Sequence, residues 1–520
     1  MTPSSPADHR GTPSAVRSGT RSADRRDDRA RVVAALTTPE LAPIVDLVLW
    51  VEDVDGAPTA HAASHLGRVA LRPGAQHEVL SGIDPVPSED AMAFLPYAAE
   101  LADPSPCGSL DNAYPLAAER ILSFFADPAR SPDVAVVHTP RHFFPEQGGH
   151  VGEHGSLDVI QSRAPLVLSG AGVRRRGLVD DHARLVDVGP TMAALAGVPE
   201  ADLHDASGEP LDGRVLTAYL EKGVVPRAVV GILWDGAHCS DLLHLAETGE
   251  LPHVARLLER GTALRGGAVA QFPSITLTNH TSILTGVGPG RHGVLGNVFY
   301  DRETEMRVVP NDASTWHRSS EWLRPGVRTV FEMVGDVIAP GAGARTASID
   351  EAIDRGADYS TMQRIRASGN TAGAGGLGAE LPDPRMSPFV RDPAMLEDAS
   401  VSWAVQVDDL GLQQMLQLWA APESAPRLTW WANIVTDAGH HAAGPRSELA
   451  RATLRQSDAR LGVFLDHLEQ LGVLDEIAIV LTADHGFEGS DPAVTGSWSA
   501  ALDRLGLAYR DEGPGLVYLL

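Results

Sequence analysis

Short runs of apolar residues alternate along the chain with longer amphipathic stretches. Apolar residues recur at helical spacing over Ser240–Arg260 and over Arg446–Leu471, and a glycine follows each stretch. Strands that alternate with helices predict an α/β fold, a sandwich with a mainly parallel central sheet and helices on both faces. The apolar runs that contain few charges, and so predict buried strands, are Leu47–Val51, Val134–His138, Pro165–Leu168, Ala228–Trp234, Leu428–Val435 and Ile477–Leu481.

Two parts of the chain lack this alternation. Residues 1–30 are polar and charged without an apolar stretch, which predicts a disordered tail rather than a secretory signal. We therefore expect a cytoplasmic protein. Residues 300–427 are rich in charges and in Gly/Ala runs such as Thr371–Gly376, and they predict a lid or cap insertion. The segments 31–299 and 428–520 are then expected to form the catalytic domain.

The composition narrows the class of partner. The chain carries 68 acidic and 42 basic residues, a formal charge of −26, which would repel duplex nucleic acid. No apolar run reaches the roughly 18–20 residues that cross a bilayer, so we expect no membrane partner. The two cysteines, Cys107 and Cys239, form no CxxC motif and exclude a disulfide framework.

Carboxylates follow three of the predicted strands. Asp235 comes directly after Ala228–Trp234, and Asp484-His485 follows Ile477–Leu481. Ligands of open α/β sheets bind at the carboxyl ends of the strands, so these side chains are placed to hold a metal. An Asp before Gly is also a common turn residue or helix cap, which is the alternative for Asp235.

Asp437 and His441 follow the third of these strands. A carboxylate and an imidazole four residues apart can bind one cation together, whereas a solvated loop is the alternative. Oxygen and imidazole donors without thiolates suit zinc, manganese or iron. Several acidic groups in one place repel each other unless cations neutralise them.

Thr276 and Asn297 are the candidates for direct contact with a substrate. Thr276 stands where a loop enters a helix, and backbone N–H groups there favour an anion and help to ionise a hydroxyl. Asn297 ends the glycine-rich run that begins at Gly288, and its amide could donate to a phosphoryl oxygen. An N-cap threonine and a turn asparagine are the structural alternatives.

Together these residues resemble the alkaline phosphatase superfamily, in its type I phosphodiesterase/nucleotide pyrophosphatase branch. The run Thr276–His280 is similar to the nucleophile motif of that branch, and Gly444-Pro445 closes its Asp-x3-His motif. That spacing makes His441 the ligand rather than His440. The residues that carry the resemblance are Asp235, Thr276, Asn297, Asp437, His441, Asp484 and His485.

The resemblance implies a hydrolase that uses two divalent ions, with zinc expected and manganese or iron as alternatives. One ion would be held by Asp235, Asp484 and His485 together with Thr276. The other would be held by Asp437, His441 and one further histidine. Thr276 would attack phosphorus and become transiently phosphorylated, with Asn297 steadying a non-bridging oxygen.

The implied substrate is a small phosphate ester, a nucleotide included, cleaved at a phosphodiester or pyrophosphate bond. A phosphonate or phosphomonoester hydrolase of the same superfamily is the alternative. A catalytically inactive binding protein on this fold is the alternative from another class. His280 and His292 are expected to be structural, and so are four tryptophans that could otherwise stack on a nucleobase: Trp316, Trp322, Trp430 and Trp431.

The family's last metal ligand is missing from its usual place, because no histidine lies in the 35 residues after His485. A similar motif stands in the first third of the chain, where His154 precedes Gly155. This departure predicts a circularly permuted domain in which residues 31–215 correspond to the usual C-terminal part. It also predicts that His154 lies with Asp437 and His441, and that Leu516–Leu520 lies near the strand at Leu47.

Overall fold

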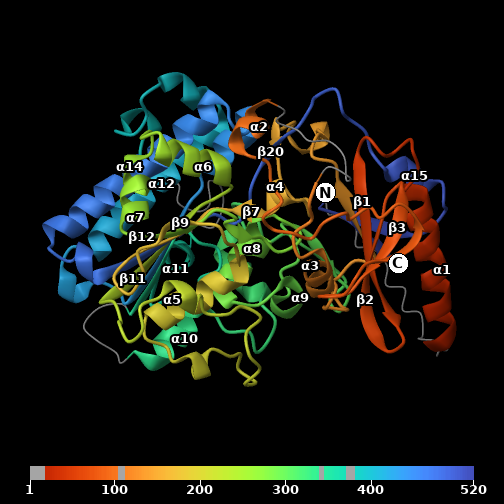
Figure 1. The fold of residues 1–520 in the computed structure, drawn as a ribbon, viewed down its shortest axis with the longest axis horizontal. Helices are drawn as coiled ribbons and strands as arrows, with labels where there is room; N and C mark the ends of the chain where they lie inside the picture. Colours follow the sequence, from red (N-terminus) through yellow and green to blue (C-terminus); the bar gives the residue numbers. More distant parts are fainter. Residues whose placement is uncertain (1–17, 103–111, 339–344, 370–380, 514) are drawn as a thin grey trace, which may run out of the picture.

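The structure, a computed structural model, describes residues 18–102, 112–338, 345–369, 381–513 and 515–520. Two large sheets lie side by side in it (Figure 1). The central sheet has the order β17 (Tyr359–Ser360), β16 (Thr346–Ile349), β18 (Leu428–Asn433), β11 (Ala228–Trp234), β19 (Ile477–Thr482), β8 (Leu166–Gly170), β12 (Gly261–Leu264) and β9 (Gly177–Val179). Its strands from β17 to β19 are parallel, whereas β8 is antiparallel to both of its neighbours.

The second sheet is antiparallel and unites the two ends of the chain. Its order is β21 (Tyr509–Glu512), β22 (Leu516–Leu519), β5 (Val134–His138), β1 (Val45–Val54), β2 (Ala57–Ala63), β3 (Gly67–Leu71) and β4 (Glu78–Gly82). Strand β22 pairs with β5, and β5 pairs with β1. Leu516–Leu520 and the strand at Leu47 therefore lie in one sheet, as predicted, with β5 between them.

Helices surround both sheets. They are α1 (Ser18–Leu36), α2 (Tyr97–Ala102), α3 (Ala117–Phe124), α4 (Val159–Ser162), α5 (Val188–Leu195), α6 (Cys239–Glu247), α7 (Pro252–Glu259), α8 (Thr276–Thr285), α9 (Pro289–His292), α10 (Val330–Val337), α11 (Thr361–Ser368), α12 (Ala399–Leu418), α13 (Val435–Ala443), α14 (Glu448–Gln470) and α15 (Ser499–Asp503). Short strand pairs join β6 (Gly152–Glu153) to β20 (Glu488–Gly489) and β14 (Phe299–Asp301) to β15 (Met306–Val308). A small sheet contains β10 (Ala183–Arg184), β13 (Ala268–Val269) and β7 (Arg163–Ala164).

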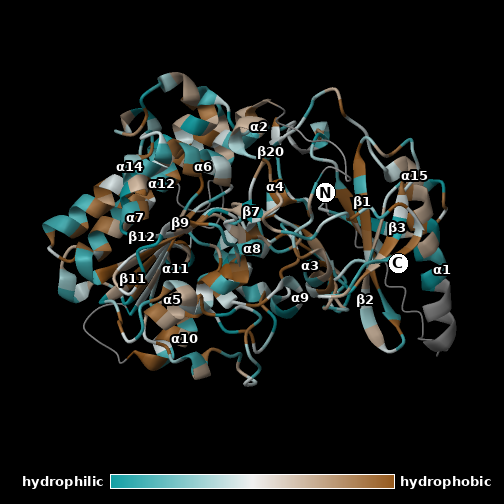
Figure 2. Cartoon of the chain, in the orientation of Figure 1, coloured by the Kyte–Doolittle hydropathy of each residue, from teal (hydrophilic) through white to brown (hydrophobic). Residues whose placement is uncertain are grey.

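The predicted α/β class is confirmed, and all six predicted strands exist. Figure 2 shows brown, apolar strands inside and mixed teal and brown on outer helices such as α14. The expectation of parallel neighbours is wrong for β1, β5 and β8, which are antiparallel to the strands beside them. The turn Asp55-Gly56 joins β1 to β2 with both residues at positive φ, the geometry of a two-residue hairpin, which forces antiparallel pairing.

The predicted helix over Ser240–Arg260 is two helices. Gly249 adopts a left-handed φ of 83°, and Pro252 opens α7 at the helix position where a missing N–H costs nothing. The second predicted helix, Arg446–Leu471, corresponds to α14.

The prediction of a disordered tail over residues 1–30 is wrong from Ser18 onward, because α1 begins there. Val32, Val33 and Leu36 of α1 are buried in an apolar cluster with strands β1, β5 and β22. Arg29 also pairs with Glu52 of β1, at 2.7 Å between Nη2 and Oε1. Packing against the second sheet therefore stabilises a segment whose composition alone indicates disorder. Residues 1–17 lie outside the described residues.

The segment 300–427 is more than a lid. Its strands β16 and β17 extend the central sheet beside β18, so this part of the predicted insertion belongs to the catalytic sheet. Helix α12 supplies buried apolar residues to the same core. The run Thr371–Gly376 and Cys107 lie outside the described residues, while Cys239 is buried. In the described part of the chain, no helix has the length and apolarity to cross a membrane.

Candidate active site

Three neighbouring parallel strands deliver acidic side chains to one edge of the central sheet. Asp235 follows β11, and Asp484 and His485 follow β19. Asp437 and His441 lie on α13, which starts directly after β18 and places them one helical turn apart on one face. They were expected just past the strand, with a solvated loop as the alternative, and the helix fixes their relative position.

Asp235, Asp484 and His485 form the first group of converging ligand atoms. His485 Nε2 lies 3.1 Å from Asp484 Oδ2 and 3.6 Å from Asp235 Oδ1. All three side chains are buried, and each has a polar atom that is buried without a hydrogen-bond partner. The Gly236 N–H donates to the other oxygen, Oδ1, of Asp484 at 2.9 Å and so holds that carboxylate in place.

His154, Asp437 and His441 form the second group. The Nε2 atoms of His154 and His441 are 3.2 Å apart, and Asp437 Oδ1 lies 3.8 Å from the first and 3.4 Å from the second. His485 borders this group as well, because its ring stacks on that of His154 with centroids 3.7 Å apart. His440 is not among these converging atoms, and its ring packs against Phe487 with centroids 5.2 Å apart.

Three of these imidazoles are anchored through Nδ1 and turn Nε2 toward the site. The Nδ1 atoms of His154, His441 and His485 lie 2.9–3.0 Å from the carbonyl oxygens of Ser274, Gly152 and Gly486. A carbonyl only accepts, so each Nδ1 carries a proton, and a neutral ring then presents its lone pair at Nε2. Two lone pairs 3.2 Å apart repel each other unless a proton or a cation lies between them.

The electrostatics of these side chains point in the same direction. Burial, and then the charges of Asp484 and Asp437, raise the pKa of Asp235 well above its usual value. Burial, and then His485 and His441, lower the pKa of His154 well below its usual value. A bound cation would lower the raised pKa of Asp235, and the lowered pKa of His154 keeps its imidazole neutral, which is the form that binds a metal.

The donor set fits divalent metal ions. Unpartnered oxygen and imidazole atoms, without a thiolate, are what zinc, manganese or iron accept. Asp235, Asp484 and His485 would hold one ion, and Asp437, His441 and His154 the other.

Thr276 is the first residue of α8 and lines a cavity together with Asp235. The next N–H along the helix, that of Leu277, donates to Asn297 Oδ1 at 3.2 Å. This contact uses the oxygen of the Asn297 amide, whose NH2 group can act only as a donor. The structure thus brings Asn297 to Thr276 at a helix start, where an anion is favoured.

The comparison with known proteins agrees with this arrangement. The family model of type I phosphodiesterase/nucleotide pyrophosphatase matches residues 229–519, which is more than half of the chain. The chain belongs to this family.

Individual relatives of the phosphodiesterase family are distant. An ectonucleotide pyrophosphatase/phosphodiesterase 2 of Saccharomyces cerevisiae is 32% identical over 89 residues, which cover 13% of this chain and 18% of that protein. An uncharacterized pyrophosphatase/phosphodiesterase of Schizosaccharomyces pombe is 23% identical over 46% of this chain and 41% of that protein. The chain therefore spans less than half the length of these two curated relatives.

Among solved structures, murine ectonucleotide pyrophosphatase/phosphodiesterase 5 in complex with AMP is 17% identical to this chain. The match covers 50% of this chain and 57% of that one, with a TM-score of 0.35.

His280 and Glu351 are additions to the site of this phosphodiesterase-family chain that the sequence did not indicate. His280 Nδ1 lies 2.8 Å from Glu351 Oε2, and its Nε2 lies 3.6 Å from Asp484 Oδ2. Trp430 donates to the same Glu351 oxygen at 2.9 Å. His280 was expected to be structural, and the structure gives it a further contact with the carboxylates. His292 is structural as expected, because Ser282 and the Val294 N–H engage its ring.

Phe487 was also missed. Its ring lies 4.8–5.6 Å from the rings of His441, His154 and His485 and separates them from the surrounding chain. The adjacent sequence Asp484-His485-Gly486 is a motif, but nothing in the pattern indicated that the following residue packs on three imidazoles.

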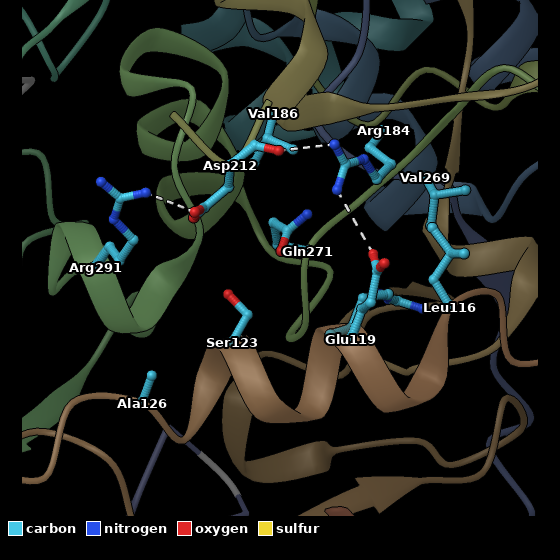
Figure 3. A pocket seen from close by; sticks show the side chains of 11 residues that line it. Leu116, Glu119, Ser123, Ala126, Arg184, Val186, Asp212, Val269, Gln271 and Arg291 are labelled. Carbon is cyan, nitrogen blue, oxygen red and sulfur yellow. Dashed lines mark hydrogen bonds and ion pairs between the residues drawn. The ribbon is translucent and has the colours of Figure 1, made fainter. Parts of the chain in front are cut away.

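A second cavity of about 260 Å³ lies away from these groups, between α3 and the loop that leads to Thr276 (Figure 3). Gln271 of that loop is buried and lines it. Two of the three arginines on its walls are engaged within the cavity: Arg184 lies 3.6 Å from Glu119, and Arg291 donates to Asp212 at 2.6 Å. We assign this cavity to the seam that binds the N-terminal part of the chain to the family-matched part.

Proposed function

We propose that the protein is a metal-dependent hydrolase of phosphodiester or pyrophosphate bonds and acts through a phosphorylated Thr276. The observation that carries the proposal is the approach of the His154 and His441 Nε2 lone pairs to 3.2 Å beside Asp437. A cation explains this approach. Membership of the phosphodiesterase family supplies the reaction class.

The side chains around Thr276 suggest how the reaction proceeds. When bound, two divalent ions would supply positive charge that lowers the pKa of the Thr276 hydroxyl and stabilises the leaving oxygen. Thr276 Oγ1 attacks phosphorus in line with the leaving oxygen, and a P–O bond forms as the ester bond breaks. The Asn297 amide and the helix N-terminus hold a non-bridging oxygen. Water then attacks phosphorus, the Thr276 Oγ1–P bond breaks, and the phosphate monoester is released as Oγ1 takes up a proton and regenerates the hydroxyl.

Circular permutation is part of the proposal. The family match begins at residue 229, yet His154, far outside it, lies among the ligand atoms. Strand β8 pairs with β19, and β6 pairs with β20, so residues from the first third of the chain adjoin both flanks of Asp484-His485. These pairings support residues 31–215 as the counterpart of the usual C-terminal part.

The substrate is proposed to be a small phosphate ester, with nucleotides among the candidates. The deciding experiment compares hydrolysis of bis-p-nitrophenyl phosphate and p-nitrophenyl phosphate by the zinc-loaded protein. We expect a diester preference that is lost in Thr276→Val and retained in Thr278→Val, an equally isosteric change two positions along the same helix.

The other outcomes separate the alternatives. Preference for the monoester would favour a phosphomonoesterase, and cleavage of a phosphonate alone would favour a phosphonate hydrolase. A protein that binds zinc but hydrolyses none of these compounds would instead be an inactive binding protein on this fold. An acid-stable p-nitrophenyl phosphoryl group on Thr276, detected by mass spectrometry after quenching of the reaction with the diester, would support the covalent step.

A further inference from the structure

The cavity at Thr276 continues into the segment 300–427. It measures about 40 Å³ and has a mostly apolar wall. The residues beyond Thr276, Asp235, Leu277 and His280 that line it are Asn311, Trp316, Asp350, Ala352, Met362, Val407 and Ile434. A single water molecule needs about 10–15 Å³ of cavity volume, so this cavity accepts a small chemical group but not a ring system.

Asp350 is the only acidic residue of this wall that belongs to neither ligand group. Both of its carboxyl oxygens are buried, and neither has a hydrogen-bond partner. The nearby Thr361 hydroxyl accepts from the Asp350 N–H and donates to Gln414 Oε1 at 2.9 Å, so it is committed elsewhere. In the part of the chain that the structure describes, no basic side chain forms an ion pair with Asp350.

The chain makes room for this carboxyl group. Asp350 adopts a left-handed φ of 54°, which Asp and Asn tolerate better than most residues. A Cβ on Gly411 of α12 would lie 2.2 Å from Asp350 Oδ2, so only glycine there leaves the carboxyl its position. The conformation and the space are both specific to Asp350.

A buried carboxylate without a partner is costly, and a bound cation offsets that cost. Burial, followed by the charge of Asp408, raises the pKa of Asp350 well above its usual value, against the smaller lowering effects of the Thr361 hydroxyl and the Arg364 charge. The Trp316 indole on the same wall offers a ring that favours a cation. We propose that this cavity binds a positively charged amine on the organic group of the substrate, paired with Asp350.

This inference rests on the proposed function and narrows its substrate class. A nucleobase exceeds the cavity, and its amino group is neutral and would leave the carboxylate uncompensated. Of the described residues that line the cavity, none is His154, Asp437 or His441, the group opposite Thr276 that would face the leaving oxygen. The amine therefore sits on the ester group that stays on phosphorus, and the substrate class is a diester of a short amino alcohol.

Two p-nitrophenyl diesters of matched size test the inference. One carries a 2-aminoethyl group and the other an n-propyl group, so they differ in the charged amine. We expect the zinc-loaded wild type to prefer the aminoethyl ester at least about tenfold in kcat/KM, as a charge-assisted hydrogen bond provides. Asp350→Asn, which keeps the shape and tolerates the left-handed backbone, should bring this ratio close to one.

Gly411→Ala provides an independent variant, because its Cβ would displace the carboxyl without changing its charge. It should lower the ratio too, whereas Gly335→Ala, another helical glycine with its nearest neighbour at 3.7 Å, should not. Asp312→Asn, at an exposed acidic residue outside the cavity, should leave both the ratio and the rates unchanged.

The outcomes separate this inference from the proposed function. Hydrolysis of both esters with a ratio near one in the wild type, or a ratio that Asp350→Asn leaves unchanged, overturns the amine site and leaves the hydrolase standing. The amine site is also overturned, in favour of a nucleobase site, if a nucleoside p-nitrophenyl phosphate is cleaved faster than the aminoethyl ester and Asp350→Asn leaves that rate unchanged. If no ester is cleaved, calorimetry decides: equal affinities for 2-aminoethyl phosphate and propyl phosphate overturn the site, and an Asp350-dependent preference supports it.

Discussion

The Nε2 atoms of His154 and His441 lie 3.2 Å apart although 287 positions separate the two residues. Each ring is anchored through Nδ1 to a backbone carbonyl, that of Ser274 for His154 and that of Gly152 for His441. Gly152 is the first residue of β6 and stands two positions before His154. The segment that carries His154 therefore also orients His441. The N-terminal third of the chain is thus built into the second group of ligand atoms.

His154→Ala tests whether this segment completes the site. We expect the purified, zinc-loaded variant to hold about one ion per chain where the wild type holds two, and to lose at least about 100-fold in kcat/KM for diesters, because one of three protein ligands is removed. Metal analysis and steady-state kinetics measure the two effects. His65→Ala, at an exposed histidine of the second sheet, is the control. Two ions and full activity in His154→Ala would contradict the permuted site.

Gly236→Ala tests the packing behind the carboxylates. Gly236 adopts φ of 60°, and a Cβ there would lie 2.4 Å from the Phe487 ring and 3.1 Å from Asp437 Oδ1. We expect reduced zinc affinity and activity because the ring and the carboxylate must both move. Gly208→Ala imposes a similar left-handed strain in open space and should cost about 1 kcal/mol of stability without loss of zinc. Equal zinc affinity in both variants, measured by competition with a chelating dye, would refute this account.

Removal of metal should destabilise the protein. The unpartnered atoms of Asp235, Asp437 and Asp484 lose their counter-charge in the metal-free state. Zinc at about 1,000 times its Kd stabilises a folded state by about 4 kcal/mol. We expect chelation to lower the unfolding midpoint in calorimetry and zinc to restore it, with a smaller response in Asp484→Asn. A midpoint that is indifferent to zinc would count against a metal site.

Asp46 should make stability fall as pH rises. Burial raises the pKa of Asp46 to about 7, although the Tyr114 hydroxyl donates to it at 2.7 Å. Between the unfolded pKa, about 4, and that value, the folded state binds more protons than the unfolded state, so stability is lost as pH increases. Asp46→Asn should therefore gain free energy of unfolding relative to the wild type from pH 4.5 to 8, by at most about 4 kcal/mol.

Urea titrations of wild type and Asp46→Asn across this pH range measure the difference directly. Asp475→Asn, at an exposed carboxylate that pairs with Arg260, should show no comparable trend. A difference that stays constant with pH would show that Asp46 ionises normally in the folded protein.

The sequence by itself determined the fold class, the strands and the chemistry of the ligands. Buried strands such as Ala228–Trp234 are visible because a strand covered on both faces must be apolar along its whole length. Asp235 and Asp484-His485 are visible because a carboxyl end of a strand is where a polar residue can leave the core. These signals are local, so one sequence suffices to find them.

The tertiary structure decided what depends on contacts between distant residues. It placed Glu351 on His280 and Asp350 against Gly411, and neither pair has a spacing that a pattern could reveal. It also shows that α1 is a helix and that β16 and β17 belong to the central sheet. In both cases the free energy gained by burying apolar side chains against another element exceeds the conformational entropy lost by ordering the segment.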